Sequence, residues 1–110
     1  MKFFSLLIVA LLSSAATAAD TTITLASTTS TQNSGLYDHL LPLFKVETGI
    51  TVNVVAVGTG QAIKIAENGD ADALLVHHRP SEDAFVANGF GIERRDIMYN
   101  DYVVIGPKDD

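Results

Sequence analysis

The chain has 110 residues with 13 acidic and 7 basic side chains, a formal net charge of −6, so it can build one modest domain at most. An acidic chain without a basic stripe argues against a nucleic-acid partner, because nucleic-acid binding depends on neutralising phosphates. The absence of cysteine excludes disulfide bonds and thiolate metal ligands. Since no spaced third ligand accompanies the adjacent histidines either, we expect no metal site. We also expect no cofactor.

Residues 1–19 have the pattern of a secretory signal peptide. Lys2 supplies the positive start, residues 3–12 form an apolar run, and Ala16-Thr17-Ala18 provides a small-residue cleavage site, although a cut after Ala19 fits equally. The alternative is an uncleaved membrane anchor, but the apolar run is short for a bilayer span. The pattern predicts cleavage and export to the periplasm as a soluble protein.

The rest of the chain alternates between strand and helix patterns. Strands are predicted at 22–26, 50–57, 73–76, 97–99 and 102–106, and helices at 35–48, 61–68 and 81–88. This order favours an α/β domain with a mostly parallel sheet, right-handed crossovers and flanking helices. In such sheets ligands bind beyond the carboxyl ends of the strands.

Local signals refine the first predicted helix. Asn33 or Ser34 is the expected N-cap, because a side-chain oxygen there can accept a backbone N–H of the first turn. Pro42 lies inside the apolar repeat and predicts a kink or a shifted boundary. Gly49 is expected to close the helix. The apolar repeat itself consists of Leu36, Leu40, Leu43 and Phe44.

Three segments leave the carboxyl ends of predicted strands: 27–34, 58–60 and 77–80. The first two bring hydroxyl side chains to the start of a helix, where unpaired N–H groups attract anions. Two such segments on neighbouring strands would converge on one oxyanion, although hydroxyls bonded only to their own backbone are the plain alternative. The candidate ligand-binding residues are Ser27, Thr28, Thr29, Ser30, Gly58, Thr59 and Gly60.

Other chemistries fit the sequence less well. A dinucleotide-binding fingerprint would need a third glycine at position 63, which is Ile63. His77 and His78 are adjacent, so they cannot be assumed to share a metal. A hydrolase that used Ser30 or Ser34 with His77 as its base would lack the usual nucleophile-elbow motif.

Three arginines are the remaining candidates for contact with an anion. Arg79 is expected near the ligand-binding segments, because it follows a predicted strand. Arg94 and Arg95 are expected on the solvated surface.

Four segments together resemble the tungstate-binding proteins of bacterial ABC importers: 25–36, 57–62, 69–77 and 98–110. They occur in the right order and cover nearly all of the chain beyond residue 19. The Thr-Thr-Thr-Ser motif of that family falls on residues 27–30, with Ser27 in place of the first threonine. The Gly-Thr-Gly motif is matched by residues 58–60, whereas His78 and Arg79 depart from the family pattern.

The resemblance implies a type II periplasmic binding-protein fold, in which a ligand lies between two α/β domains. Residues 20–110 are then expected to be part of the first domain, because family members are more than twice as long. The implied function is not enzymatic: a monomer captures tungstate outside the cytoplasm and delivers it to an ABC permease in the inner membrane. Molybdate, phosphate and sulfate remain alternative ligands, and a small-substrate hydrolase using His77 remains an alternative function.

Overall fold

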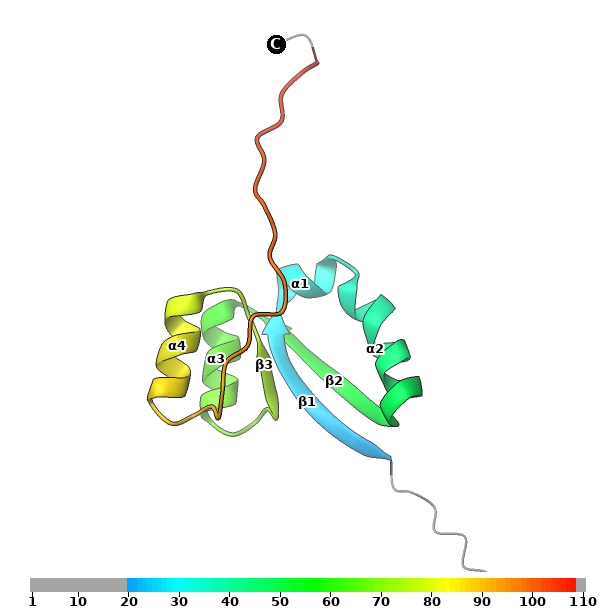
Figure 1. Ribbon diagram of the computed structural model, residues 1–110, viewed down its shortest axis with the longest axis vertical. Coiled ribbons are helices and arrows are strands. Elements are labelled where there is room, and N and C mark those ends of the chain that lie inside the picture. Colours follow the sequence, from blue (N-terminus) through cyan, green and yellow to red (C-terminus); the bar gives the residue numbers. More distant parts are fainter. Residues whose placement is uncertain (1–19, 109–110) are drawn as a thin grey trace, which may run out of the picture.

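The structure is a computed structural model that describes residues 20–108. The predicted signal peptide, residues 1–19, lies outside the described residues. The elements in chain order (Figure 1) are β1 (Thr21–Thr28), α1 (Thr29–Asn33), α2 (Leu36–Thr48), β2 (Ile50–Val57), α3 (Thr59–Glu67), β3 (Ala73–Leu75) and α4 (Arg79–Ala87). None of these helices is long and apolar enough to cross a bilayer.

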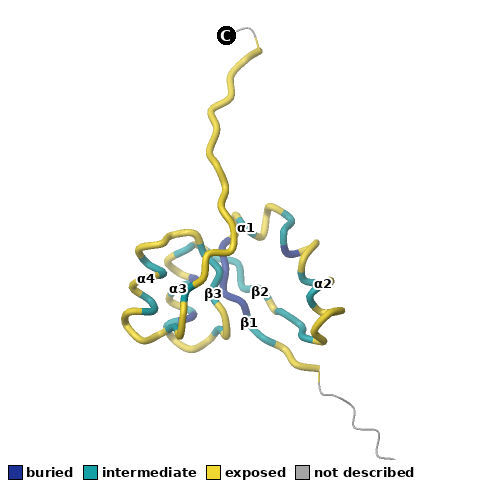
Figure 2. Tube along the Cα trace, in the orientation of Figure 1, coloured by how far each residue is buried: buried dark blue, intermediate teal, exposed yellow. Residues whose placement is uncertain are grey.

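The three strands form one parallel sheet in the order β2-β1-β3. β1 pairs with β2 along its whole length, from Thr21 opposite Ile50 to Thr28 opposite Val57. Because β1 has a neighbour on both edges, its carboxyl half is the most buried part of the sheet (Figure 2). The predicted α/β class with a parallel sheet is confirmed, and so are the bounds of β2.

Helices lie on both sides of the sheet. The chain moves from β1 to β2 in one direction and from β2 past β1 to β3 in the other. With right-handed crossovers, this reversal puts the connecting helices on opposite faces. Figure 1 accordingly shows α2 on one side of the strands and α3 with α4 on the other.

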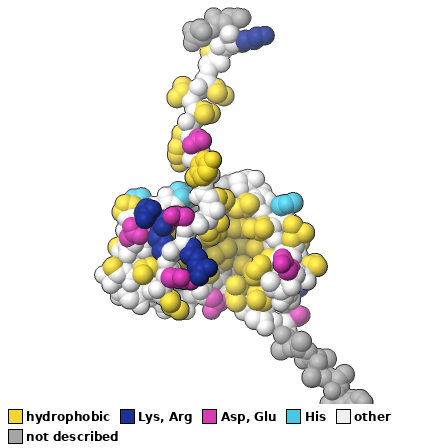
Figure 3. Space-filling view, in the orientation of Figure 1, with side chains coloured by type: hydrophobic (Ala, Val, Ile, Leu, Met, Phe, Trp, Pro, Cys, Tyr) yellow, Lys and Arg dark blue, Asp and Glu magenta, His cyan; other side chains and the backbone are white. Residues whose placement is uncertain are grey.

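The two faces are packed unequally. On α3, Ala62 and Ala66 are buried, because small side chains let a helix approach the sheet closely. On α2 only Tyr37 is buried, while Leu40 and Leu43 remain 46% and 57% exposed. Two members of the apolar repeat predicted for this helix are thus largely exposed. Figure 3 shows a broad apolar surface over α2 and the sheet.

The three local signals in α2 differ in outcome. Gly49 closes the helix with φ of 74°, as predicted, and its N–H donates to the carbonyl of Lys45. Pro42 lies inside the helix without shifting its boundary. The predicted N-cap was wrong: Gly35, with φ of 81°, occupies that position. Ser34 precedes it, and its hydroxyl still accepts the N–H of Leu36 at 3.3 Å.

The last two predicted strands, 97–99 and 102–106, are wrong for the described residues. This segment leaves the body of the molecule as an extended chain and pairs with no strand there (Figure 1). Its apolar side chains are open to solvent, with Val104 and Ile105 at 103% and 88% exposure. β-branched residues favour extended backbone, but a strand also requires a neighbour for its hydrogen bonds.

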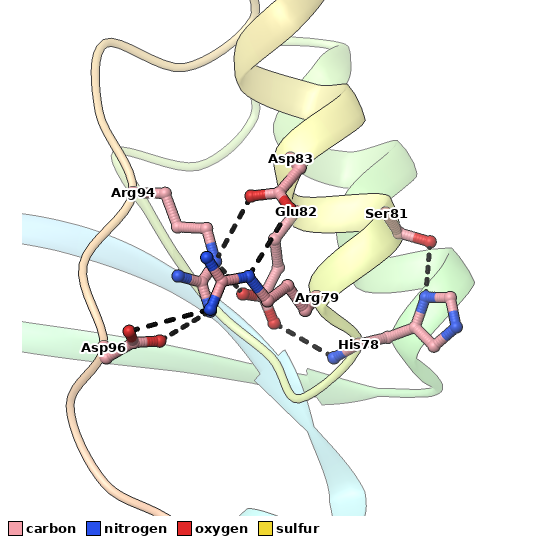
Figure 4. A network of polar contacts seen from close by, with 7 residues as sticks. All are labelled: His78, Arg79, Ser81, Glu82, Asp83, Arg94 and Asp96. Carbon is pink, nitrogen blue, oxygen red and sulfur yellow. Dashed lines mark hydrogen bonds and ion pairs between the residues drawn. The ribbon is translucent and has the colours of Figure 1, made fainter.

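The stretch before this extended segment is tied to α4 by Arg94, which the sequence placed on the solvated surface. Instead, its side chain is 20% exposed. Its Nε donates to Glu82 at 2.6 Å and its Nη2 to Asp96 at 2.7 Å (Figure 4). Arg79 adds longer ion pairs to Asp83 at 3.5 Å and to Asp96 at 3.9 Å. Arg95, by contrast, is 77% exposed, as predicted.

The hydrogen bond from Arg94 lowers the pKa of Asp96 below its ordinary value of 3.8, with a smaller contribution from the charge of Arg79. A carboxyl group with a lowered pKa stabilises the folded state above its unfolded pKa, and the effect is lost as pH falls through the folded value. The contact between Arg94 and Asp96 should therefore hold at neutral pH and open only below 3.8.

We predict that Arg94→Gln returns the titration midpoint of Asp96 towards 3.8, because the charged donor that favours its carboxylate is removed. Arg95→Gln is the matched control and should leave the midpoint low. Carbon-detected NMR titration of the Asp96 carboxyl group measures both. An Asp96 midpoint that is the same in Arg94→Gln as in the unaltered protein would contradict the assignment.

Candidate functional site

The carboxyl ends of β1 and β2 lie side by side. Thr28, the last residue of β1, is opposite Val57, the last residue of β2. α1 begins at once after Thr28, and α3 begins after a single residue, Gly58. The crossover rule places the helices that follow these strands on opposite faces of the sheet. Ligands of open α/β sheets bind outside the carboxyl ends of the strands.

The separation of the helices was not foreseen from the sequence. α1 and α3 do not contact each other in the described structure. A single ion between the two helix starts would thus be reached by side chains and N–H groups from either side. Contact of Thr29 and Thr59 with one ion remains a prediction.

The hydroxyl segment predicted as a turn is the end of a strand followed by a short helix. Thr28 is the N-cap of α1: its Oγ1 accepts the N–H of Thr31 at 3.4 Å and lies 2.8 Å from the Thr31 hydroxyl. Thr28 is only 2% exposed, so its hydroxyl acts within the protein. Thr29 and Ser30, the next two residues, are exposed at the start of the helix, and the Ser30 hydroxyl lies 3.2 Å from that of Thr28.

Ser27 has a different position from the one the sequence suggested. Its side chain is fully buried, and its hydroxyl donates to the carbonyl of Leu75 at 2.8 Å. A serine hydroxyl has one proton to donate. Because that proton is already used inside the protein, Ser27 is better explained as a packing and hydrogen-bonding residue than as a ligand donor.

Gly58, Thr59 and Gly60 form a helix start rather than a loop. Gly58 is the N-cap of α3 with φ of −68°, and Thr59 and Gly60 are its first residues. Neither glycine needs positive φ, and a Cβ at either position would meet nothing within 4 Å. The described chain therefore gives no internal reason for glycine at these two positions.

The third predicted segment, 77–80, is shorter than expected because α4 already begins at Arg79. His78 is the N-cap residue, and its Nδ1 lies 2.7 Å from the hydroxyl of Ser81 (Figure 4). His77 is exposed and lines a hollow of about 380 Å³ together with Arg79 and Tyr99. Arg79 thus lies beyond the end of β3, the strand that pairs with β1.

No serine–histidine pair is formed by the residues that the hydrolase alternative requires. Ser30 bonds to Thr28, and the hydroxyl of Ser34 donates to the carbonyl of Thr31 at 2.6 Å. Nothing in the geometry between 20 and 108 therefore favours this alternative. Within the same range no three histidine or carboxylate side chains gather where they could hold a metal ion.

Two residues near the site were missed by the sequence reasoning. Tyr37 bonds to the hydroxyl of Ser27 from α2, and Thr31 bonds to Thr28 from within α1. Thr31 could have been found, because a Ser or Thr N-cap contacts the backbone three residues later. Tyr37 had no local signal, since its partner lies ten positions away on another element.

Comparison with known proteins identifies close relatives. The sequence matches the family described as the PBP superfamily domain over residues 13–110. It is 55% identical over 94 residues to the tungstate-binding protein TupA of Peptoclostridium acidaminophilum, an alignment covering 86% of this chain and 33% of that protein.

Solved structures of similar proteins agree with this sequence match. The tungstate-binding protein TupA from Desulfovibrio alaskensis superposes with a TM-score of 0.79 and 52% identity, over 82% of this chain and 36% of that one. The tungstate ABC transporter structure from Geobacter sulfurreducens gives 0.74 and 54%, over 81% and 38%. The chain spans about a third of the length of these relatives. Given the family match over residues 13–110 and this degree of identity, the chain belongs to the PBP superfamily domain family.

Proposed function

We propose that this chain helps to bind a tetrahedral oxyanion, in the first place tungstate, outside the cytoplasm and for delivery to an ABC importer. The observation that carries the proposal is the pairing of Thr28 with Val57, which sets two helix starts with hydroxyl residues at the same edge of the sheet. The named relatives support the choice of tungstate, since two similar proteins are described as tungstate-binding proteins TupA.

The proposed contacts are all hydrogen bonds from neutral groups. The hydroxyls of Thr29 and Ser30 approach from the start of α1, and that of Thr59 from the start of α3. Unpaired N–H groups at the same helix starts add further donors, and their dipoles favour negative charge. These local donors let a dianion bind within a chain whose net charge is −6, because contacts at a few ångströms outweigh a screened global charge.

The two glycines of the α3 start support a ligand at this position. Glycine occupies positions 58 and 60 although neither the backbone conformation nor the surrounding atoms require it. A ligand that lies against the backbone N–H groups would require it, because a Cβ would fill the space that the ligand occupies. The site, as the described residues form it, is an open edge of the sheet.

The wider proposals rest on the relatives and on the predicted signal peptide. The pattern at residues 1–19 directs the protein across the membrane, and the partner is an ABC permease that accepts the ion. Capture is non-covalent and involves no catalytic residue. Molybdate is the nearest competitor, because it is a tetrahedral dianion of nearly the same size.

We predict that the protein expressed from its complete reading frame binds tungstate and that Thr29→Val and Thr59→Val each weaken binding by about tenfold or more. A hydrogen bond to a charged group contributes about 1.5–3 kcal/mol, which corresponds to that loss. Isothermal titration calorimetry with sodium tungstate measures the affinity. Thr22→Val, an exposed change at the opposite end of β1, is the control and should bind as the unaltered protein does. Full affinity in both site variants would reject the proposed donors.

A second prediction separates ligand contact from stability. Gly60→Ala should raise the free energy of unfolding by up to about 1 kcal/mol, because Gly60 lies in a helix without positive φ. It should nevertheless weaken tungstate binding several-fold, because the new methyl group occupies ligand space.

The control is Gly69→Ala, which lies beyond the other end of α3 with φ of 80°. This change should lower stability, because alanine is strained in that conformation, and should leave tungstate affinity unchanged. Urea denaturation and calorimetry on the same samples give both quantities. Unchanged tungstate affinity in Gly60→Ala would contradict a ligand that lies against the backbone of Gly60.

A further inference from the structure

Three elements meet in a buried relay of hydroxyl groups. Ser27 is fully buried and Tyr37 is 4% exposed. The Ser27 hydroxyl donates its proton to the carbonyl of Leu75. The phenol of Tyr37 is hydrogen-bonded to the same Ser27 oxygen, and it must donate, because serine has only one proton. The relay therefore runs from α2 through the end of β1 to the last residue of β3.

The hydrogen bond between Ser27 and Tyr37 joins the two ends of a short chain segment that contains all of α1. Ser27 and Tyr37 are ten positions apart, and α1 lies between them without a buried residue of its own. At its front the helix is fixed by Thr28, which is both strand residue and N-cap. At the other end of α1 the chain turns at Gly35, the N-cap of α2, and Tyr37 follows in the first turn of α2. The hydrogen bond of Tyr37 to Ser27 therefore holds this end of the segment.

The chemistry of the pair points to positioning rather than to stability. Phenylalanine and alanine at these positions would fill nearly the same volume, and removing both partners of a buried hydrogen bond is often close to neutral. The hydroxyl groups add a defined geometry. A hydrogen bond fixes the distance and angle between its two side chains, whereas apolar side chains in contact can shift relative to each other. The direction fixed here is that of the segment carrying Thr29 and Ser30.

We infer that Tyr37 is a positioning residue of the anion site, which acts through Ser27 to hold α1 so that Thr29 and Ser30 face the ligand. This inference rests on the proposed function, because it assigns Tyr37 a role in that site. It extends the site to a residue that itself reaches no ligand, since its hydroxyl is buried on Ser27.

The test uses Tyr37→Phe in the protein expressed from its complete reading frame. Tyr102→Phe is the matched control, because it removes the same hydroxyl from a side chain that is 92% exposed. Hydrogen exchange is followed at the amides of Ser34 and Gly35, which donate to carbonyls of α1 at 3.2 and 3.1 Å. Asn88, whose amide donates to Ala84 of α4 at 2.9 Å, reports on the rest of the fold.

In Tyr37→Phe we expect exchange at Ser34 and Gly35 to become about tenfold faster, as for the loss of one ordinary hydrogen bond. Exchange at Asn88 should stay unchanged, and the tungstate dissociation constant should rise several-fold. In a double-mutant cycle with Ser27→Ala, the changes in binding free energy should be non-additive, because Tyr37 acts only through Ser27. Tyr102→Phe should match the unaltered protein in every measurement.

Other outcomes overturn the inference. Equal acceleration at Ser34, Gly35 and Asn88 would show a role in global stability only. Faster exchange in α1 with unchanged tungstate affinity would show that the relay does not serve the site, and unchanged exchange would show that it does not hold α1. If the unaltered protein fails to bind tungstate in the same titration, the proposed function fails and the role of Tyr37 in the site fails with it. The exchange data alone would then still report whether the relay holds α1.

Discussion

The parallel pairing of β1 with β2 is the constraint on which the candidate site depends. It runs in register over the full length of both strands, so their carboxyl ends cannot lie anywhere but side by side. Each end leads into a helix within one residue. Because parallel strands need crossover connections, and because β1 is central, those helices diverge to opposite faces. Two sets of backbone donors thus flank one edge without any charged side chain being required.

Burial follows from the same arrangement. The carboxyl half of β1 is enclosed by strands on both sides and by helices on both faces, and this is where hydroxyl residues begin (Figure 2). Inside that enclosure a hydroxyl must find a partner within the protein, since an unpaired buried polar group is costly. Ser27 and Thr28 do so, whereas Thr29 and Ser30, just past the enclosure, are left exposed. The boundary between the buried hydroxyls and the exposed hydroxyls that we propose as ligand donors therefore falls within one continuous polar run.

The sequence predicted the elements better than it predicted which hydroxyl groups are buried. β2 was predicted to the residue, because a β-branched run closed by glycines at both ends allows little else. The polar run was correctly placed at a strand end, but its chemistry gave no means of telling Ser27 from Ser30. Similarly, Arg94 could not be assigned from sequence, because its partners Glu82 and Asp96 come from a helix and a following loop. The strand at 102–106 was predicted from propensity alone, which cannot supply a neighbouring strand.

The position of a bound tungsten atom would show whether the two helix starts share one ligand. Crystals of the protein expressed from its complete reading frame, grown with sodium tungstate, would give the position of the metal by anomalous diffraction at a tungsten absorption edge. The expected result is one tungsten peak whose oxyanion lies within hydrogen-bond distance, about 2.7–3.2 Å, of the hydroxyls of both Thr29 and Thr59. A tungsten peak that contacts only one of these two helix starts, or neither, would contradict a shared site between the ends of β1 and β2.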